Sequence, residues 1–112
     1  MISKRRRKRM PAKRDSMTIR VPHHVNPATT SFLVTMGHYP DGAIGEIFIN
    51  TEMRAGSDSD TNVADFAIVV SLALQHGCSL GTIVDAMKHN RDGSPTGMFA
   101  HILDAVRREV ER

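Results

Sequence analysis

The chain has 112 residues, of which 40% are hydrophobic, with one cysteine and no tryptophan. This length fits one domain with a core of its own, and a single cysteine excludes an intramolecular disulfide and a zinc site made of cysteines alone. The formal net charge of +3 conceals an asymmetry: residues 1–20 hold nine Lys and Arg against one Asp, and the rest hold six basic and eleven acidic residues. We therefore expect a basic arm attached to an acidic domain.

Two general properties indicate where the protein works. No apolar run approaches the roughly 20 residues that a membrane-spanning helix needs, so we expect no membrane contact. The N-terminal charges precede no apolar segment of the kind found in a secretory signal peptide. A single cysteine agrees with a reducing compartment, and we expect a cytoplasmic protein.

We expect residues 1–16 to form the basic arm and residues 17–112 to form the domain. The arm contains six consecutive cations, which repel one another and bury nothing, so we expect it to be disordered in the free protein. Such a block of cations is typical of nucleic-acid binding. Because the arm has no aromatic residue to stack on bases, we expect any such binding to be salt-sensitive and without sequence preference. A solvated linker, or an arm that folds back onto the chain's own acidic face, is the alternative. The candidate nucleic-acid-binding residues are Lys4, Arg5, Arg6, Arg7, Lys8, Arg9, Lys13 and Arg14.

The first strand is expected at the start of the domain. MTIRV, residues 17–21, alternates in the way that is typical of a strand, and Pro22 follows it. Because Pro22 and Pro27 interrupt any hydrogen-bonded ladder, we expect the strand to end at Pro22 and residues 23–30 to form a loop.

A hairpin is expected next. Residues 31–36 and 43–50 are β-rich runs, and the turn GHYPDG joins them, which predicts two antiparallel strands. Gly45, inside the second run, indicates a bulge or a close approach of another part of the chain. A sheet of two or three strands leaves open edges, so a homodimer is a possible arrangement of this chain.

The strongest helix pattern covers residues 61–76. Most of its circumference is apolar, so we expect a central and buried helix. Asp60, Thr61 or Asn62 would cap its N-terminus, and Gly77 would end it.

Two further helices are expected. Ser79 would cap the second, and Ser94 with Pro95 would form the N-cap and the first position of the third. Two or three strands followed by three helices predict an α+β fold with a small antiparallel sheet.

The loop before the first helix partly matches a calcium-binding loop. Asp58, Asp60 and Asn62 occupy the first, third and fifth positions of such a loop. The sixth position requires Gly and is Val63, and the twelfth requires a bidentate Glu and is Val69. We therefore expect helix capping rather than calcium binding.

Other polar patterns are weaker. RAGSD, residues 54–58, precedes a helix as phosphate cradles do, but it lacks the lysine and spacing of a P-loop. Cys78 follows a helix end, beside the start of the next helix, which could lower the pKa of a nucleophilic thiol. We expect it instead to be a small residue that fills a packed junction. Six histidines invite a metal interpretation, but none stands in an H-x-x-x-H pair, and we expect no metal or other cofactor. They are His23, His24, His38, His76, His89 and His101.

Four segments in chain order resemble a known family: GHYPDGAIGEIFIN, AGSD, SLALQHGCSLGTIVDAMKH and SPTG. They are similar to the TSCPD domain, the C-terminal accessory domain of adenosylcobalamin-dependent (class II) ribonucleotide reductases, which also occurs as a free-standing protein. The resemblance spans residues 9–100 and gives a signature loop of Gly45, Glu46, Phe48, Gly56, Ser57 and Asp58.

The resemblance implies a role without chemistry of its own. Reductases of this type use a barrel of several hundred residues, a thiyl-radical cysteine and a redox pair of cysteines, whereas this chain has Cys78 alone. We therefore expect no catalytic residue and no activity outside an association with ribonucleoside-diphosphate reductase. The leading hypothesis is an accessory or interaction domain in deoxyribonucleotide synthesis, which binds a reductase large subunit, another protein or itself through a sheet edge or the acidic loop face. The alternative is a small nucleic-acid-binding protein that uses its basic arm.

Overall fold

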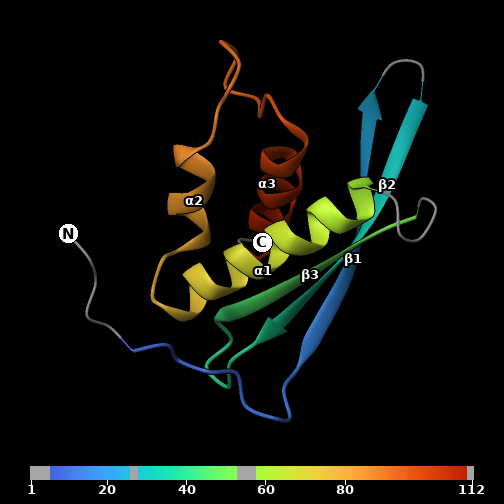
Figure 1. Cartoon of the computed structure of the whole chain (residues 1–112). Coiled ribbons are helices and arrows are strands. Elements are labelled where there is room, and N and C mark those ends of the chain that lie inside the picture. The colour runs from blue at the N-terminus through green and yellow to red at the C-terminus, as the bar shows by residue number, and fades with distance from the viewer. Residues whose placement is uncertain (1–5, 26–27, 53–57, 111–112) are drawn as a thin grey trace.

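The computed structural model describes residues 6–25, 28–52 and 58–110 and contains one antiparallel sheet followed by three helices (Figure 1). The strand order is β1-β2-β3, with both neighbouring pairs antiparallel. The α+β prediction is therefore confirmed. The elements are β1 (Ser16–Val25), β2 (Ala28–His38), β3 (Ile44–Thr51), α1 (Asp58–Gln75), α2 (Leu80–Ala86) and α3 (Met98–Val110).

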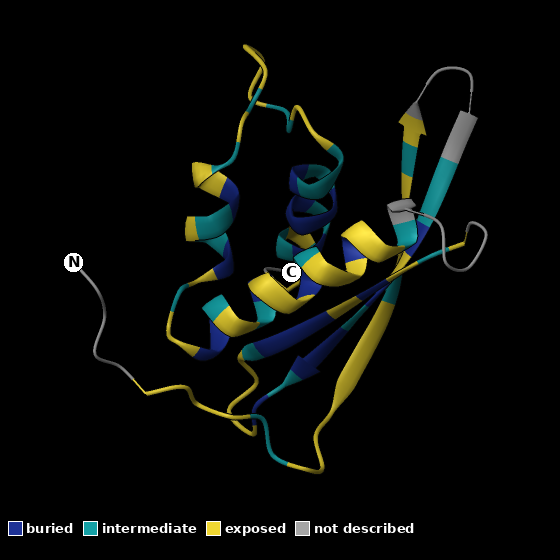
Figure 2. Cartoon of the chain, in the orientation of Figure 1, coloured by how far each residue is buried: buried dark blue, intermediate teal, exposed yellow. Residues whose placement is uncertain are grey.

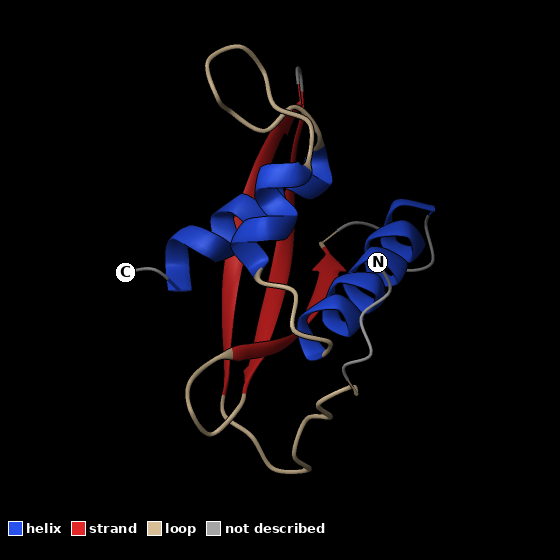
Figure 3. Cartoon of the chain, turned by 90° about the vertical axis from the view of Figure 1, so that its left-hand side faces the viewer, coloured by secondary structure: helices blue, strands red, loops and turns tan. Residues whose placement is uncertain are grey.

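One face of the sheet and the helices that pack on it form the core. Alternation along the strands places one set of apolar side chains toward the helices, and Figure 2 shows these buried positions between the two layers. Figure 3 shows α1 beside β3 and α3 across the longer strands, in agreement with the α1–β3 and α3–β1 contacts. The fully buried large side chains are Phe32, Met36, Ile47, Ile102, Leu103, Val34, Val63, Val70, Val84 and Val106.

The prediction that β1 ends at Pro22 was wrong, because β1 continues to Val25. Pro22 pairs with Ser31 on β2. The Ser31 carbonyl accepts a hydrogen bond of 3.1 Å from the amide of Glu52, just after β3, so it points away from β1 and the backbone of Pro22 in turn points away from β2. β1 is an edge strand, and at this position an N–H would have no strand partner. Proline is therefore tolerated there, and the loop expected over residues 23–30 is largely strand.

The hairpin of β2 and β3 agrees with the sequence. The turn closes with a hydrogen bond from the Tyr39 amide to the Ala43 carbonyl, and Gly42 has a φ of 90°, which favours glycine. The register shifts after Gly37 so that Gly45 has no partner on β2, and the predicted bulge is confirmed.

Helix α1 begins earlier than expected and is buried on one face. It starts at Asp58, which places Asp60 inside the helix, where its carboxylate accepts a hydrogen bond of 3.2 Å from the Thr51 hydroxyl. The expected caps at residues 60–62 were therefore wrong. The face that packs on the sheet is Val63, Ala67, Val70 and Leu74. The outer side is apolar but exposed, so burial of the helix holds for its inner face alone; the exposed residues are Ile68 (58%), Val69 (64%) and Leu72 (39%).

The end of α1 and the start of α2 are as predicted. Gly77 has a φ of 91° and follows the end of α1. The Ser79 hydroxyl then caps α2 by accepting a hydrogen bond of 3.1 Å from the Thr82 amide.

The predicted start of α3 was wrong. The Ser94 hydroxyl donates a hydrogen bond of 2.6 Å to Asp92, and Pro95 forms an isolated β-bridge with His89, so the helix begins three residues later, at Met98. None of the described helices combines the length and hydropathy that crossing a bilayer requires.

Candidate functional site

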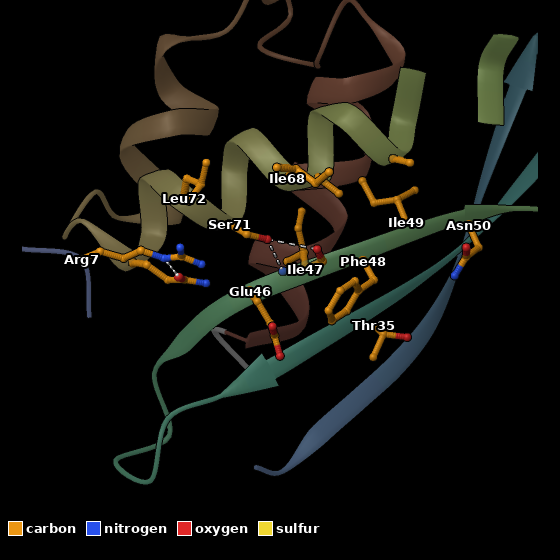
Figure 4. Close-up of a pocket in the computed structure, with 13 residues that line it drawn as sticks. Arg7, Thr35, Glu46, Ile47, Phe48, Ile49, Asn50, Ile68, Ser71 and Leu72 are labelled. Carbon is orange, nitrogen blue, oxygen red and sulfur yellow. Dashed lines mark hydrogen bonds between the residues drawn. The ribbon is translucent and has the colours of Figure 1, made fainter. Parts of the chain in front are cut away.

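Helix α1 runs along the outer edge of β3 and covers part of it. The Ser71 hydroxyl accepts a hydrogen bond of 2.9 Å from the Ile47 amide and donates one of 3.1 Å to the Ile47 carbonyl (Figure 4). One turn later, the Gln75 side chain donates a hydrogen bond of 2.9 Å to the Gly45 carbonyl. Two polar side chains of the helix thus replace a neighbouring strand along this stretch of the edge.

A groove of about 590 Å³ lies between α1 and β3. Its walls contain large apolar side chains that are unusually exposed: Phe48 is 50% exposed, Ile68 58% and Leu72 39%. Phe48 stands on the outer face of the sheet, because its strand neighbours Ile47 and Ile49 point into the core. The lining residues are Arg7, Thr35, Glu46, Ile47, Phe48, Ile49, Asn50, Ala64, Ala67, Ile68, Ser71, Leu72 and Gln75.

The basic arm reaches one end of this groove. The Arg7 guanidinium donates a hydrogen bond of 2.5 Å to the Gln75 side chain, and the Lys8 amide donates one of 2.8 Å to the Gln75 carbonyl. The Lys8 carbonyl accepts a short hydrogen bond from the Tyr39 hydroxyl, and the Lys8 ammonium lies 4.4 Å from the centre of the Tyr39 ring. Burial raises the pKa of Tyr39 and the charges of Glu46 and Asp41 add to that rise, while Arg7 opposes it.

The most buried ion pair of the arm joins Arg14 to Glu46. The guanidinium contacts both carboxylate oxygens, with 3.0 Å between Nη2 and Oε1. It also donates a hydrogen bond of 2.7 Å to the Pro11 carbonyl. The Glu46 side chain is 10% exposed, so this pair is partly shielded from water and salt.

The candidate arm residues therefore divide into three groups. Arg7, Lys8 and Arg14 contact the domain, as an arm that folds back on its own chain would. Arg6, Arg9 and Lys13 are exposed, and no ion pair forms at them among the described residues. The remaining two candidates, Lys4 and Arg5, lie outside the described residues. The boundary between arm and domain at residue 16, and nucleic-acid binding itself, stay predictions.

The signature loop is only partly within the described residues. Gly45, Glu46 and Phe48 lie on β3, at the arm contact and in the groove wall, whereas Gly56 and Ser57 lie outside the described residues. Asp58, the sixth signature residue, is the first residue of α1. The phosphate-cradle interpretation of residues 54–58 falls mostly on the undescribed stretch.

Sequence reasoning did not single out Ser71 and Gln75 as site residues. They are the polar members of an otherwise apolar stretch and lie four residues apart, which places them on one helix face. That spacing is the signal by which the sequence could have revealed a polar seam on this helix. Tyr39, the third missed residue, gave no such signal.

The other candidate sites gain little from the structure. Among the described residues, no three His, Cys, Asp or Glu side chains are grouped so that they could hold a metal ion. The His23 and His101 rings lie 4.9 Å apart, and burial lowers the pKa of His23, with the charges of His101 and His24 adding to the effect. Cys78 is partly buried, with its sulfur 3.8 Å from the Ser79 carbonyl oxygen.

Comparison with known proteins gives a consistent result. A family model described as TSCPD domain matches residues 3–112. A vitamin B12-dependent ribonucleotide reductase of Rhodopirellula baltica is 35% identical over 91 residues, which is 81% of this chain and 8% of that protein. One of Bradyrhizobium diazoefficiens is 36% identical over 118 aligned positions, covering 98% of this chain and 9% of that protein. The chain thus spans less than a tenth of these relatives, and no solved structure matches it.

Proposed function

Because this chain belongs to the TSCPD domain family, we propose that it is a non-catalytic accessory module that docks on the catalytic part of a vitamin B12-dependent ribonucleotide reductase. The groove between α1 and β3 is the docking surface. The reductase relatives contain a segment similar to most of this chain, and that segment is a small part of each of them. The single cysteine, Cys78, cannot supply both a radical thiol and a redox pair.

The observation that carries the proposal is the exposure of apolar side chains around the groove. Phe48, Ile68 and Leu72 lie together on the two walls, where each leaves more than a third of its surface in water. Clustered apolar side chains of this kind mark interaction sites more often than scattered ones do. An aromatic ring beside aliphatic side chains is also the usual composition of an interface centre.

The hydrogen bonds of β3 limit how a partner can bind. The Ile47 amide and carbonyl are both occupied by Ser71, and the Gly45 carbonyl is occupied by Gln75. A partner strand therefore cannot extend the sheet along this stretch without displacing those side chains. We propose that the reductase contributes side chains to the groove instead of an added strand.

The test compares two neighbouring residues of α1. Ile68 lines the groove, whereas Val69 is more exposed, at 64% against 58%, and does not line it. We expect Ile68→Lys to weaken binding to purified vitamin B12-dependent ribonucleotide reductase by about tenfold or more, as loss of an interface anchor does. Val69→Lys adds the same charge and should change the dissociation constant by less than about threefold.

Titration calorimetry with the purified vitamin B12-dependent ribonucleotide reductase provides the measurement, and circular dichroism of both variants checks that α1 is intact. Absence of binding by the unaltered chain at tens of micromolar would overturn the proposed function. Equal weakening by the two lysine variants would leave the reductase as the partner but exclude the groove as its binding site.

The cytoplasmic location expected from the sequence stays a prediction.

Self-association through the same groove is a separate expectation. The apolar walls formed by Phe48 and Ile68 would also accept a second copy of the chain. Light scattering at micromolar concentration distinguishes the cases, because a monomer there removes the homodimer without affecting reductase docking.

A further inference from the structure

Residues 7–14, here called the strap, cross the end of the sheet and contact Tyr39, Gly45, Glu46 and Gln75. These four residues, with Gly37 beneath the Glu46 side chain, are here called the cradle. The strap is held at its start by the Gln75 carbonyl and side chain and at its end by the Glu46 carboxylate.

Two glycines of the strands leave space that the strap and its partner fill. A Cβ atom on Gly45 would overlap the Met10 sulfur and the Tyr39 ring, and a Cβ atom on Gly37 would overlap the Glu46 side chain. Glycine weakens a strand, so two glycines at this point indicate a close approach that the fold requires. The strap therefore has a shaped seat on the domain.

The end of α1 adds an electrostatic reason for the strap to bind. The last turn of α1 contains no basic residue, although the negative end of the helix dipole favours one. Arg7 and Lys8 supply cations there, and the Lys8 amide pairs with the Gln75 carbonyl, which has no partner within the helix.

The charges of strap and cradle are unequal. The strap contains five cations, and the cradle offers one carboxylate, that of Glu46. Apart from Met10 and Pro11, the residues of the strap are exposed, so the docked state rests on a few hydrogen bonds and one shielded ion pair. Segments with so few buried contacts open at low free energy.

We propose that the strap is detachable, and that its release from the cradle frees Arg7, Lys8 and Arg14 to bind a nucleic-acid phosphate backbone. The domain and the nucleic acid compete for the same cations of the strap. The apparent affinity for nucleic acid is therefore the affinity of the released strap multiplied by the fraction of chains in which the strap is released. This mechanism does not depend on reductase docking, and its test contains no reductase.

The test uses two carboxylate variants that change the net charge equally. Glu46→Gln removes the ion pair with Arg14, whereas Glu52→Gln removes the pair of Glu52 with Arg20, which lies outside the cradle. We expect Glu46→Gln to tighten binding to a fluorescent DNA duplex by about tenfold, and Glu52→Gln to tighten it by less than about twofold. The slopes of log affinity against log salt should differ by no more than about one phosphate contact, because the same phosphates are contacted once the strap is released and Glu52→Gln has only the ion pair of Arg14 with Glu46 to break in addition.

Trypsin provides a readout that needs no nucleic acid. Cleavage within residues 7–14 should be faster in the released strap, because the protease needs an extended stretch of chain free of contacts, so we expect Glu46→Gln to be cleaved about tenfold faster than the unaltered chain and Glu52→Gln at the unaltered rate. Tyr39→Phe, which removes only the hydroxyl that donates to the Lys8 carbonyl, should accelerate cleavage in the same direction and serves if Glu46→Gln does not fold.

Three results would overturn the proposal. The first is an equal change of DNA affinity in the two carboxylate variants. The second is an unchanged rate of trypsin cleavage in Glu46→Gln, which would mean that the ion pair with Arg14 does not hold the strap on the cradle. The third is the absence of DNA binding by every variant at low salt, which would leave the strap without a competing ligand.

Discussion

The two outer edges of the sheet are protected in different ways. At β3, the buried side chain of Gln75 and the hydroxyl of Ser71 take up backbone groups of Gly45 and Ile47. At β1, Pro22 has no amide hydrogen to offer at the edge, and its carbonyl accepts one hydrogen bond of 2.8 Å from His101, in an exposed position.

The difference concerns the environment of each hydrogen bond. Ile47 is 1% exposed and Gln75 is 5% exposed, so water is a poorer substitute for a lost partner at the β3 edge. The hydrogen bond at Pro22 is exposed, and water can replace His101 there. We therefore expect substitutions to be costly at the β3 edge and mild at the β1 edge.

The largest effect is expected at Ser71. Ser71→Val leaves both the amide and the carbonyl of Ile47 without their partner in a buried place, which should lower the free energy of unfolding by about 2–4 kcal/mol. Urea denaturation measures the loss. Ser71→Thr retains a hydroxyl and should lose less than about 1 kcal/mol; equal losses in the two variants would show that packing, and not hydrogen bonding, protects this edge.

A smaller effect is expected at Gln75. Gln75→Met has a similar volume but removes the hydrogen bond to the Gly45 carbonyl and the one from Arg7, so we expect a loss of about 1–2 kcal/mol. Gln75→Glu still accepts a hydrogen bond from Arg7 but cannot donate to Gly45. Comparison of the urea midpoints of the two variants separates the contributions of the two hydrogen bonds. A loss of less than about 0.5 kcal/mol in Gln75→Met would contradict the expectation that this edge is shielded from water.

At the β1 edge, His101→Gln should have little effect. The hydrogen bond to the Pro22 carbonyl is exposed, so we expect the free energy of unfolding to change by about 0.5 kcal/mol or less. Thermal unfolding at pH 7.5 is the measurement. A loss comparable to that of Ser71→Val would remove the distinction between the two edges.

The smallest effect is a pH dependence at the same edge. The pKa of His23 is lowered in the folded protein, by burial first and then by His101 and His24. The unfolded chain therefore binds more protons just below the ordinary histidine pKa of about 6.5. The contribution of His23 is complete above that pH and is lost as the pH falls through the folded pKa. His23→Gln should flatten the decline of the unfolding midpoint between pH 7 and 5, and an unchanged decline would assign it to other groups.

Local sequence patterns predicted which helices and strands form better than they predicted where those elements begin and end. The β-rich runs and the apolar helix stretch gave the α+β order correctly, because period and composition are local properties. The strand end predicted at Pro22 was wrong, because the effect of a proline depends on whether the strand is at an edge of the sheet, which is a tertiary property. The same holds for Ser94, whose hydroxyl pairs with Asp92 two residues away instead of capping a helix.

The site was predictable in part. The family resemblance identified Gly45, Glu46 and Phe48 without indicating what they contact. The partner of Glu46 is Arg14, 32 residues earlier in the chain, and no local pattern connects the two. The block of cations likewise does not reveal which of its members the domain engages, because that depends on where a carboxylate and a helix end meet in the folded chain.

The hydrogen bond between the Lys8 amide and the Gln75 carbonyl joins residues 67 positions apart. The packed unit therefore begins before its first strand, at a segment that belongs to neither sheet nor helix. A shortened chain that starts at Met17 would contain nearly all of the regular structure, yet the C-terminal turn of α1 would lack the amide and the two cations that complete it. For recombinant work on this protein, residues 7–14 should therefore be kept, because even a strap that opens at low free energy completes the end of α1 while it is docked.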